Sequence, residues 1–294
     1  MTTLIRKRTE PAELVLLSHL KNRMTFTAEQ TRRWEALTAG YFGEKRCDHS
    51  LEKADISALL LPDLHLSAAG RYAQIDTLLI TDDQLIILEI KHFQGDYEWN
   101  DEGWWTPGNL IIPSPLIQLE RSISLLKRIL QQSGLNHMSK VSGKVLFTHP
   151  DFTLHHLQKH PEIVLPTQMR SFITSLKTLR VTSRSHKTAR FFQKIQNLNP
   201  YERPLPDYSF QQLKKGIFCP QCGTSMSAKS NKLIHCTTCS FYEAKHECAL
   251  RMMYELRILF PHFRPTGALL YQWCGKQISK RTFSRILTAA NAAK

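Results

Sequence analysis

The sequence lacks any apolar run long enough to cross a membrane. The apolar stretch near its start, Leu14-Val15-Leu16-Leu17, is far shorter than the roughly 20 residues of a membrane-spanning helix, and no small-residue cleavage site follows it. We therefore expect a cytoplasmic protein without a membrane partner. Internal repeats and low-complexity tracts are also absent, and 42% hydrophobic with 22% charged residues is typical of a folded globular protein.

Acidic residues are scarce toward the C-terminal end. The chain has 39 Lys and Arg against 25 Asp and Glu, a formal net charge of +14. Residues 209–294 hold 13 basic and 3 acidic residues, a net +10, which leaves +4 for residues 1–208. Such charge concentrates a polyanion and makes its binding sensitive to salt. Nucleic acid is the expected partner, although charge alone equally allows a basic protein whose lysines only keep it in solution.

The apolar pattern indicates a mixed α/β protein. At 294 residues the chain can form one substantial core and one or two small additional domains. The pattern predicts, in order, a helix over 27–46 with a Thr27–Gln30 capping box and an end at Gly43-Glu44, strands over 74–80 and 85–91 joined in a hairpin, a helix from Pro115, strands over 144–148 and 162–165, and a helix from Met169 to Leu176.

Acidic residues and a lysine occupy the predicted hairpin. Asp76 is followed, after twelve residues, by Glu89-Ile90-Lys91. Side chains alternate along a strand, so Glu89 and Lys91 should lie on one side, and hairpin pairing can bring Asp76 beside Glu89. Two such carboxylates repel each other unless a cation lies between them, and Mg²⁺ suits this site because it binds one or two carboxylates and keeps several waters. A lysine there can orient water or stabilise charge on a phosphate.

Three segments resemble a known family. Gln74-Ile75-Asp76, then Glu89-Ile90-Lys91 followed by His92-Phe93-Gln94-Gly95, and Ser114-Pro115-Leu116-Ile117-Gln118 resemble the NERD (nuclease-related) domain over about residues 30–150. That family is grouped with the PD-(D/E)XK nucleases, so the resemblance implies a restriction-endonuclease-like mixed β-sheet flanked by helices. It also implies Asp76 and Glu89 as ligands of Mg²⁺ or Mn²⁺, Lys91 as the catalytic lysine, Gln118 as an active-site residue on the following helix, and Glu44 as the early acidic position.

The sequence departs from the family pattern at two positions. His92 stands where the family tends to have Asn, and Ser122 stands where some related nucleases have Tyr. Neither change removes a metal ligand; the first bears on substrate contacts and the second on the role of Gln118. The alternative is an ordinary hairpin in which Glu89 and Lys91 form a surface ion pair worth about 0–1 kcal/mol. The ordered set of Asp, Glu-x-Lys and Pro-x-x-Gln favours the nuclease.

Two Cys-x-x-Cys pairs predict a structural zinc site. Cys219 and Cys222 are separated from Cys236 and Cys239 by 13 residues, close to zinc-ribbon spacing. Four thiolates complete a tetrahedral coordination sphere and leave no position open for chemistry. The alternative is a pair of redox motifs, but one such motif normally suffices and neither follows a strand-to-helix pattern. The other cysteines, Cys47, Cys248 and Cys274, are expected to be buried residues.

The basic C-terminal segment suggests a helix-turn-helix. One helix is expected from Gly267 to Cys274 with Thr266 as its cap, and a second after Ser279. The second helix would expose Lys280, Arg281 and Arg285, which could contact DNA, although short basic helices often have no such role.

Two clusters of ring side chains are expected to be structural. His155 and His156 point apart on most elements, and Pro161 ends any helix after His160, so no metal site is predicted there. The tryptophans Trp99, Trp104 and Trp105 could stack on unpaired bases, but a loop packed over the sheet is the commoner arrangement.

A domain order and a function follow from these observations. Three prolines within 198–208 indicate a connector, giving a nuclease domain over 1–200 with its motifs in about 30–150, a linker over 201–215, a zinc ribbon over 216–245 and a basic helical tail over 246–294. We expect hydrolysis of DNA, with RNA left open, by an enzyme that uses Mg²⁺ or Mn²⁺ and holds one Zn²⁺. The alternatives are an inactive nuclease fold that binds DNA or assembles with a partner, and a zinc-dependent transcription regulator.

Overall fold

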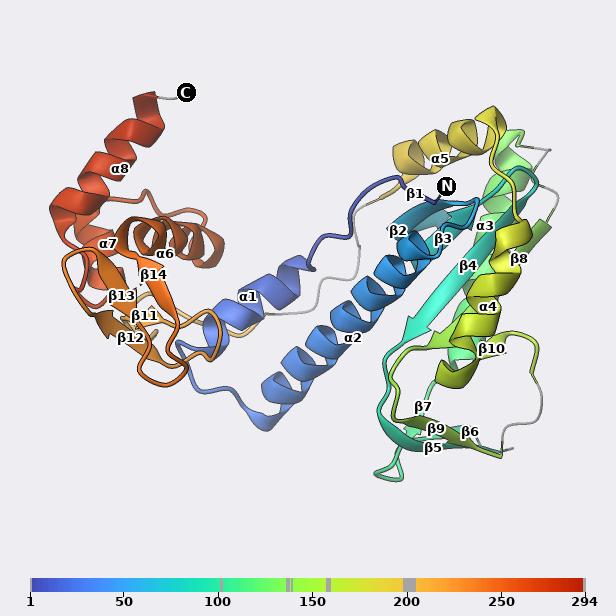
Figure 1. Ribbon diagram of the computed structural model, residues 1–294, viewed down its shortest axis with the longest axis horizontal. Helices are drawn as coiled ribbons and strands as arrows, with labels where there is room; N and C mark the ends of the chain where they lie inside the picture. Colours follow the sequence, from blue (N-terminus) through green and yellow to red (C-terminus); the bar gives the residue numbers. More distant parts are fainter. Residues whose placement is uncertain are drawn as a thin grey trace. The chain divides into compact units, whose positions relative to one another are not determined.

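The chain folds into two compact units. The computed structural model describes residues 2–100, 103–135, 138, 140–156, 160–197 and 205–292, the side chains of 290–292 excepted. The first unit, here called the sheet unit, comprises Met1–Thr9 and Ala36–Arg203, and the second, the ribbon unit, comprises Glu10–Glu35 and Pro204–Lys294 (Figure 1). Among the described residues, no helix is both long and apolar enough to cross a membrane.

A mixed six-stranded sheet forms the centre of the sheet unit. The strand order is β1-β2-β3-β4-β8-β10. The β2–β3 and β3–β4 pairs are antiparallel, and the β1–β2, β4–β8 and β8–β10 pairs are parallel. The strands are β1 (Thr3–Leu4), β2 (Leu59–Ala68), β3 (Arg71–Ile80), β4 (Gln84–Lys91), β8 (Lys140–Phe147) and β10 (Ile163–Val164). The expected α/β class with a mixed sheet is therefore confirmed.

Helices cover both faces of this sheet (Figure 1). On β4, Leu85 and Ile87 pack in one core with residues of α3 and α5, whereas Ile86 and Leu88 pack in another core with residues of α2 and α4. A strand segment buried on both faces is continuously apolar instead of alternating, as residues 85–88 of β4 are. The helical elements are α2 (Ala28–Lys53), α3 (Pro115–Ser133), the 3-10 turn η1 (Pro166–Gln168), α4 (Met169–Ser175), the 3-10 turn η2 (Leu176–Thr178) and α5 (Ser183–Ile195).

A smaller sheet in the same unit contains the tryptophans. Its strand order is β7-β6-β5-β9. Trp104 is only 1% exposed and stacks on Trp99 and Phe147, with ring centroids 5.3 and 5.8 Å apart. These two tryptophans therefore pack against the core rather than forming an open stacking surface. The strands are β5 (Gly95–Asn100), β6 (Gly103–Trp105), β7 (Ile111–Ile112) and β9 (Phe152–His155).

The ribbon unit has one core shared by strands and helices. Its sheet has the order β11-β12-β13-β14. Phe210 and Leu213, which the sequence-based division assigned to a linker, are buried in the same core as residues of the ribbon strands and of the C-terminal helices. The elements are α1 (Ala12–Lys21), β11 (Ile217–Phe218), β12 (Ser225–Ala228), β13 (Leu233–His235), β14 (Tyr242–Ala244), α6 (Lys245–Leu259), α7 (Gly267–Trp273) and α8 (Lys280–Ala292).

A buried arginine joins residues 10–35 to this core. Arg23 is fully buried, and its Nε and Nη2 donate to the Glu255 carboxylate at 2.9 and 2.6 Å. Its Nη1 donates to the Lys214 carbonyl at 2.7 Å, and its guanidinium lies 3.6 Å from the Trp273 ring centroid. Because a buried charge is stable only when it is paired, these contacts fix the N-terminal segment in the ribbon unit.

Helix α2 begins as predicted but continues past its expected end. The capping box is formed, since Gln30 N donates to Thr27 Oγ1 at 3.2 Å and Thr27 N donates to Gln30 Oε1 at 2.9 Å. The expected end at Gly43-Glu44 is wrong, because the helix runs on to Lys53. A Cβ on Gly43 would lie 2.4 Å from the Cβ of His92, so this glycine permits close packing against the residue after β4.

Candidate active site and metal centres

The β3–β4 hairpin brings Asp76 and Glu89 to neighbouring positions. Thr77 pairs with Leu88, so the next position in this register places Asp76 opposite Glu89. The backbone N–H of Ile90 donates to Asp76 Oδ2 at 2.7 Å, which ties the aspartate of one strand to the end of the other. The two strands therefore present both acidic side chains at one place.

The Glu89 carboxylate is buried, and one of its oxygens lacks a hydrogen-bond partner among the described residues. The side chain is 0% exposed, so the alternative of a surface ion pair does not describe it. Lys91 Nζ lies 2.6 Å from Glu89 Oε1 in an ion pair, and Glu89 Oε2 has no hydrogen-bond partner among the described residues. Burial and the negative charge of Asp76 raise the pKa of Glu89 to about 8. A buried carboxylate oxygen without a partner, beside a second acidic group, suits a cation.

Lys91 connects Glu89 to the following helix. Its Nζ donates to Gln118 Oε1 of α3 at 3.1 Å. Burial opposes the charge of Lys91, but Glu89 and Asp76 outweigh it and raise the pKa of the ammonium. Lys91 is therefore held in its charged form, within reach of the acidic pair and positioned by Gln118.

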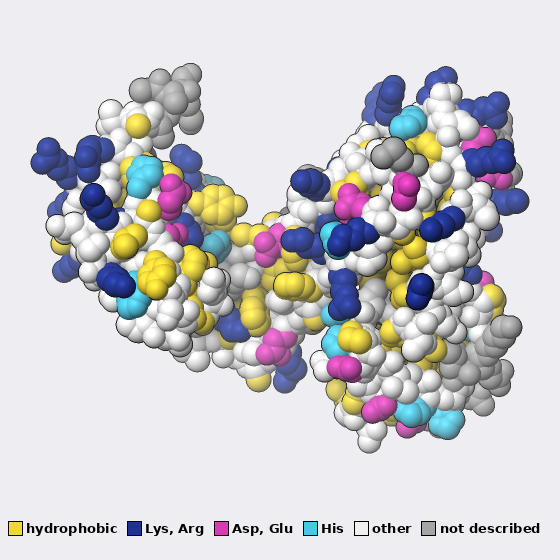
Figure 2. All heavy atoms as spheres, viewed as in Figure 1, with side chains coloured by type: hydrophobic (Ala, Val, Ile, Leu, Met, Phe, Trp, Pro, Cys, Tyr) yellow, Lys and Arg dark blue, Asp and Glu magenta, His cyan; other side chains and the backbone are white. Residues whose placement is uncertain are grey.

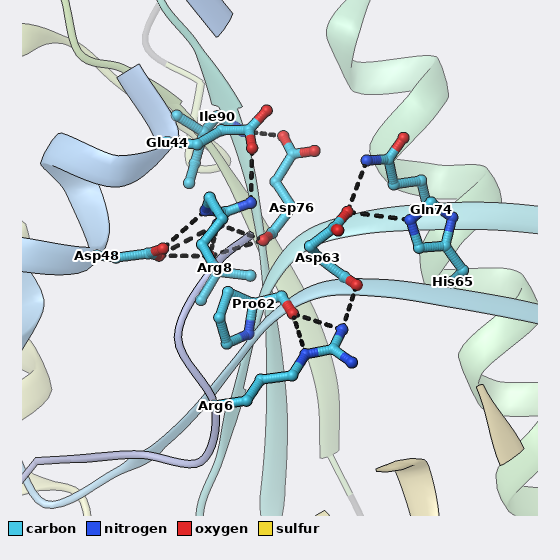
Figure 3. Close-up of polar contacts among 11 residues, drawn as sticks. Arg6, Arg8, Glu44, Asp48, Pro62, Asp63, His65, Gln74, Asp76 and Ile90 are labelled. Atoms are coloured by element: carbon cyan, nitrogen blue, oxygen red, sulfur yellow. Dashed lines mark hydrogen bonds and ion pairs between the residues drawn. The ribbon is translucent and has the colours of Figure 1, made fainter. Parts of the chain in front are cut away.

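Glu44 approaches from α2, and Arg8 orients it (Figure 3). The Arg8 side chain is 3% exposed; its Nη1 donates to Glu44 Oε2 at 2.6 Å and its Nε to Asp48 Oδ2 at 2.8 Å. Its Nη2 donates to the Asp76 carbonyl at 2.6 Å and to Thr77 Oγ1 at 2.8 Å. Arg8 thus links α2 to β3 beside the acidic pair. Sequence reasoning missed both Arg8 and Asp48, because neither belongs to a recognisable spacing.

Acidic charge accumulates at this site beyond what Arg8 and Lys91 offset. Burial and the charge of Asp76 raise the pKa of Glu44 to about 8. Burial likewise raises the pKa of Asp76, although Lys91, the Ile90 N–H and Arg8 act against the shift. The three acidic groups, on two strands and a helix, therefore disfavour one another's ionised forms. A divalent cation would relieve this repulsion.

A basic pocket adjoins the carboxylates. It is lined by Arg6, Lys7 and Arg8 together with Asp63 and His65, among others. Asp63 Oδ1 accepts from Gln74 Nε2 at 2.9 Å and from His65 Nε2 at 3.0 Å (Figure 3). Gln74, part of the Gln-Ile-Asp segment, therefore holds the wall of this pocket rather than the acidic pair.

The two departures from the family pattern have local partners. His92 Nδ1 lies 2.8 Å from Thr148 Oγ1, and its ring contacts that of His149 with centroids 4.9 Å apart. Ser122 is buried and donates to the Gln118 carbonyl at 3.1 Å, within α3. Ser122 therefore bonds only to the backbone of α3, and the Gln118 side chain keeps its contact with Lys91.

Of the three histidines after β8 singled out in the sequence, His155 and His160 make ion pairs. His155 Nε2 lies 3.1 Å from Asp96, and His160 Nδ1 lies 3.0 Å from Glu162. His156 has a positive φ of 60°, in a turn after β9. Their arrangement agrees with the structural role expected for them.

The four cysteines converge on one point. Their sulfur atoms all lie within 4.8 Å of one another, with 3.5 Å from Cys219 to Cys239 and from Cys222 to Cys236. A tetrahedral zinc ion with Zn–S distances of about 2.3 Å places its sulfurs about 3.8 Å apart, so the cluster fits zinc. All seven cysteines are free of disulfides. Convergence into one cluster favours zinc over two separate redox pairs.

The acidic site is a looser group than the cysteine cluster. Of the described residues, only the four cysteines form a set of three or more Cys, His, Asp or Glu whose ligand atoms all lie within 4.8 Å. The carboxylates therefore do not make a closed protein cage. Mg²⁺ usually binds one or two carboxylates and fills its other positions with water, which such an open site allows.

The basic side chains expected on the last helix are exposed. Lys280, Arg281 and Arg285 of α8 face solvent, while Phe283 and Ile286 are buried. The predicted caps are formed, since Thr266 Oγ1 accepts from Leu269 N and Ser279 Oγ from Thr282 N, each at 3.2 Å. Figure 2 shows Lys and Arg side chains gathered at the edge of the ribbon unit near its C-terminal helices.

One segment of the sheet unit matches a known protein family. Residues 39–148 match the family model described as nuclease-related domain. This segment is a NERD domain. The match includes Glu44, Asp76, Glu89, Lys91 and Gln118, and the sequence-based assignment of the family is therefore confirmed. No curated protein and no solved structure matched the chain.

Arg8 and the ribbon unit lie outside the matched segment. Arg8 precedes it by 31 residues, and the cysteine cluster begins at Cys219. Thus the NERD match includes the acidic pair and Lys91, and a residue from outside the match completes the contacts of Glu44.

Proposed function

We propose that this protein is a metal-dependent nuclease that hydrolyses DNA phosphodiester bonds, with Asp76 and Glu89 holding Mg²⁺ or Mn²⁺. The NERD domain supports a nuclease-related function. The observation that carries the metal-dependent activity is the Glu89 carboxylate, which is buried next to Asp76 with Oε1 against the Lys91 ammonium and Oε2 without a hydrogen-bond partner among the described residues. A resident structural pair would instead be expected to satisfy its buried oxygens.

Each residue of the site has a role in this proposal. Asp76 and Glu89 would hold the cation, with Glu44 as a further acidic group at its edge. The cation, when bound, would polarise the scissile phosphate and lower the pKa of the attacking water. Lys91 would donate a hydrogen bond to that water or to a phosphate oxygen, and Gln118 would keep its ammonium in place. Arg8 would position Glu44, since it bonds both Glu44 and the backbone of Asp76.

The ribbon unit supports the choice of a nucleic-acid substrate. Its zinc, enclosed by four cysteines, would be structural, and the net charge of +10 over residues 209–294 attracts a polyanion. We infer that Lys280, Arg281 and Arg285 on α8 contribute phosphate contacts, as the second helix of a helix-turn-helix formed by α7 and α8.

A cleavage assay on linear, nicked and branched DNA tests the activity. We expect wild-type protein to cut with Mg²⁺ or Mn²⁺ and not with a chelator. Lys91→Ala should lower turnover by about 100-fold or more, while DNA binding persists. Lys127→Ala is the matched control, because Lys127 is an exposed lysine of α3 away from the acidic pair.

Metal binding gives a readout that does not depend on turnover. Mn²⁺ titration followed by electron paramagnetic resonance should show binding that Asp76→Asn and Glu89→Gln weaken and Lys127→Ala does not. Equal cleavage by wild type and Lys91→Ala would remove the catalytic assignment. Salt-sensitive binding without cleavage under any metal would favour the inactive binding module.

A further inference from the structure

The sheet of the zinc ribbon has one packed face and one open face. Met226 and Ile234 are 1% and 0% exposed and point into the core of the ribbon unit. Glu243 of β14 points toward α6, where Arg251 donates to its carboxylate at 2.6 and 2.9 Å. Because neighbouring residues of a strand point to opposite faces, Leu233, His235 and Tyr242 lie on the other side.

An aromatic pair occupies the open face. His235 and Tyr242 are direct partners in the β13–β14 register, and their rings are nearly parallel, with centroids 6.0 Å apart and an interplanar angle of 18°. Tyr242 is 56% exposed and Leu233 beside it is 39% exposed. Lys229 Nζ lies 5.1 Å from the centroid of the Tyr242 ring. The open face therefore presents two parallel, stacked rings, with a lysine ammonium over the Tyr242 ring.

The charge around this face has one sign. Residues 208–242 contain no Asp or Glu and four lysines, at positions 214, 215, 229 and 232. The next acidic residue, Glu243, is bound by Arg251 on the opposite face. A polyanion can thus approach the face without repulsion from this segment. An acidic protein partner would leave the rings without a contact, and a hydrophobic protein partner would leave the lysines without a counter-charge.

We propose that this ribbon face, formed by Lys229, Leu233, His235 and Tyr242, binds single-stranded DNA. Bases would stack on Tyr242 and His235, and Lys229 would contact the phosphate backbone. Bases in a duplex already stack on each other and do not present their faces to an exposed ring, so unpaired strands are preferred. The choice of DNA rests on the proposed function, and the face would hold the unpaired parts of a substrate.

Binding of short oligonucleotides tests the ribbon face. The full-length, zinc-loaded chain is titrated into a fluorescent 20-nucleotide oligo-dT, and separately into a blunt duplex of equal length. The buffer contains no Mg²⁺ and no chelator. Binding is followed by fluorescence anisotropy. Base–aromatic stacking contributes about 1–3 kcal/mol per base, so Tyr242→Ala should weaken oligo-dT binding by about 5- to 150-fold. Tyr242→Phe should restore most of this loss, and duplex binding should change little.

Tyr254→Ala is the matched control. Tyr254 is 61% exposed on α6 of the same unit but lies outside the ribbon face, so oligo-dT binding should keep its wild-type strength. Lys229→Ala should reduce the salt dependence of oligo-dT binding by about one counterion. Zinc content is measured for every variant, so that a misfolded ribbon is not counted as lost stacking.

Several results would overturn this assignment. Equal losses from Tyr242→Ala and Tyr254→Ala, or equal losses for oligo-dT and duplex, would exclude a stacking site, and tighter binding of oligo-rU would exclude DNA as the partner. The test is independent of catalysis: Lys91→Ala should bind oligo-dT like wild type. If single strands bind but no DNA is cleaved, the ribbon face is supported and the nuclease is contradicted. If DNA is cleaved but Tyr242→Ala binds oligo-dT as tightly as wild type, the nuclease is supported and the ribbon face is contradicted.

Discussion

In the ribbon unit Glu255 is buried against Arg23, and in the sheet unit Glu89 is buried against Lys91. Glu255 accepts two hydrogen bonds from Arg23 and one from Trp273 Nε1 at 3.3 Å, and His19 lies 3.5 Å away. Burial raises its pKa, but His19 and Arg23 outweigh burial and lower it to about 2. Glu89 has the Lys91 ammonium 2.6 Å from Oε1, Asp76 nearby and no partner for Oε2 among the described residues, and burial and the charge of Asp76 raise its pKa to about 8.

The contrast is between a carboxylate that several donors surround and a carboxylate that only one cation contacts among the described residues. Each glutamate is almost fully enclosed, so exposure does not separate them. Hydrogen bonding separates them. A carboxylate with several hydrogen-bond donors stabilises the fold in its ionised form, whereas a buried carboxylate with few donors beside a second acid keeps its proton or requires a bound cation. This difference predicts opposite responses to substitution, to pH and to metal.

Zinc removal should produce the largest change. Structural zinc contributes on the order of 10 kcal/mol to a small domain, and two of the four clustered cysteines, Cys219 and Cys236, are buried in the core of the ribbon unit. We expect a strong chelator to abolish the cooperative melting of this unit, followed by near-ultraviolet circular dichroism. Added Zn²⁺ should restore the transition and Mg²⁺ should not. A melting curve that is insensitive to zinc loss would contradict a zinc-dependent core.

Glu255→Gln should cause the next largest loss. The substitution leaves Arg23 buried without a counter-charge, which costs about 3–5 kcal/mol of unfolding free energy. Urea denaturation followed by tryptophan fluorescence measures this loss, since Trp273 contacts both residues. Glu247→Gln, an exposed position of the same helix, is the control and should be nearly silent. If both variants lose the same stability, the Arg23–Glu255 pair does not hold residues 10–35 in place.

Glu89→Gln should have a smaller effect of the opposite sign. Without metal, removal of a buried, unsatisfied charge should raise the unfolding free energy by about 1–3 kcal/mol at pH 8.5. Stabilisation by Mn²⁺ should disappear in the same variant. Glu98→Gln, an exposed site on β5, should change neither quantity. A destabilised Glu89→Gln that still responds to Mn²⁺ would place the cation elsewhere.

The pH dependence should be the subtlest difference. The pKa values of Glu44 and Glu89 are raised from 4.5 to about 8, so the folded chain holds protons that the unfolded chain releases. Metal-free stability of the sheet unit should therefore fall as pH rises from about 4.5 through 8. Saturating Mn²⁺ should oppose this fall, because it binds the ionised carboxylates. Thermal melting in matched buffers measures both trends, and a stability that rises over this range without metal would contradict the raised pKa values.

Local pattern was sufficient for much of the fold. The hairpin of β3 and β4, the start of α3 at Pro115 and the caps at Thr27, Thr266 and Ser279 all follow the sequence prediction. Each depends on contacts within a few residues or on alternation along one strand. The end of α2 was mispredicted because Gly43 does not end the helix. This glycine instead leaves room for His92, which is distant in sequence and packs against it.

The sequence alone determined which residues could be proposed as metal ligands. Asp76, Glu89 and Lys91 are related by strand alternation and hairpin pairing, and the four cysteines by their spacing, so both groups are readable without coordinates. Only the tertiary structure showed that Arg8 bonds Glu44 and Asp48, 36 and 40 residues away, and that Arg23 bonds Glu255 across 232 residues. Such contacts have no local periodicity, because they arise where separate elements pack and buried charges must find partners.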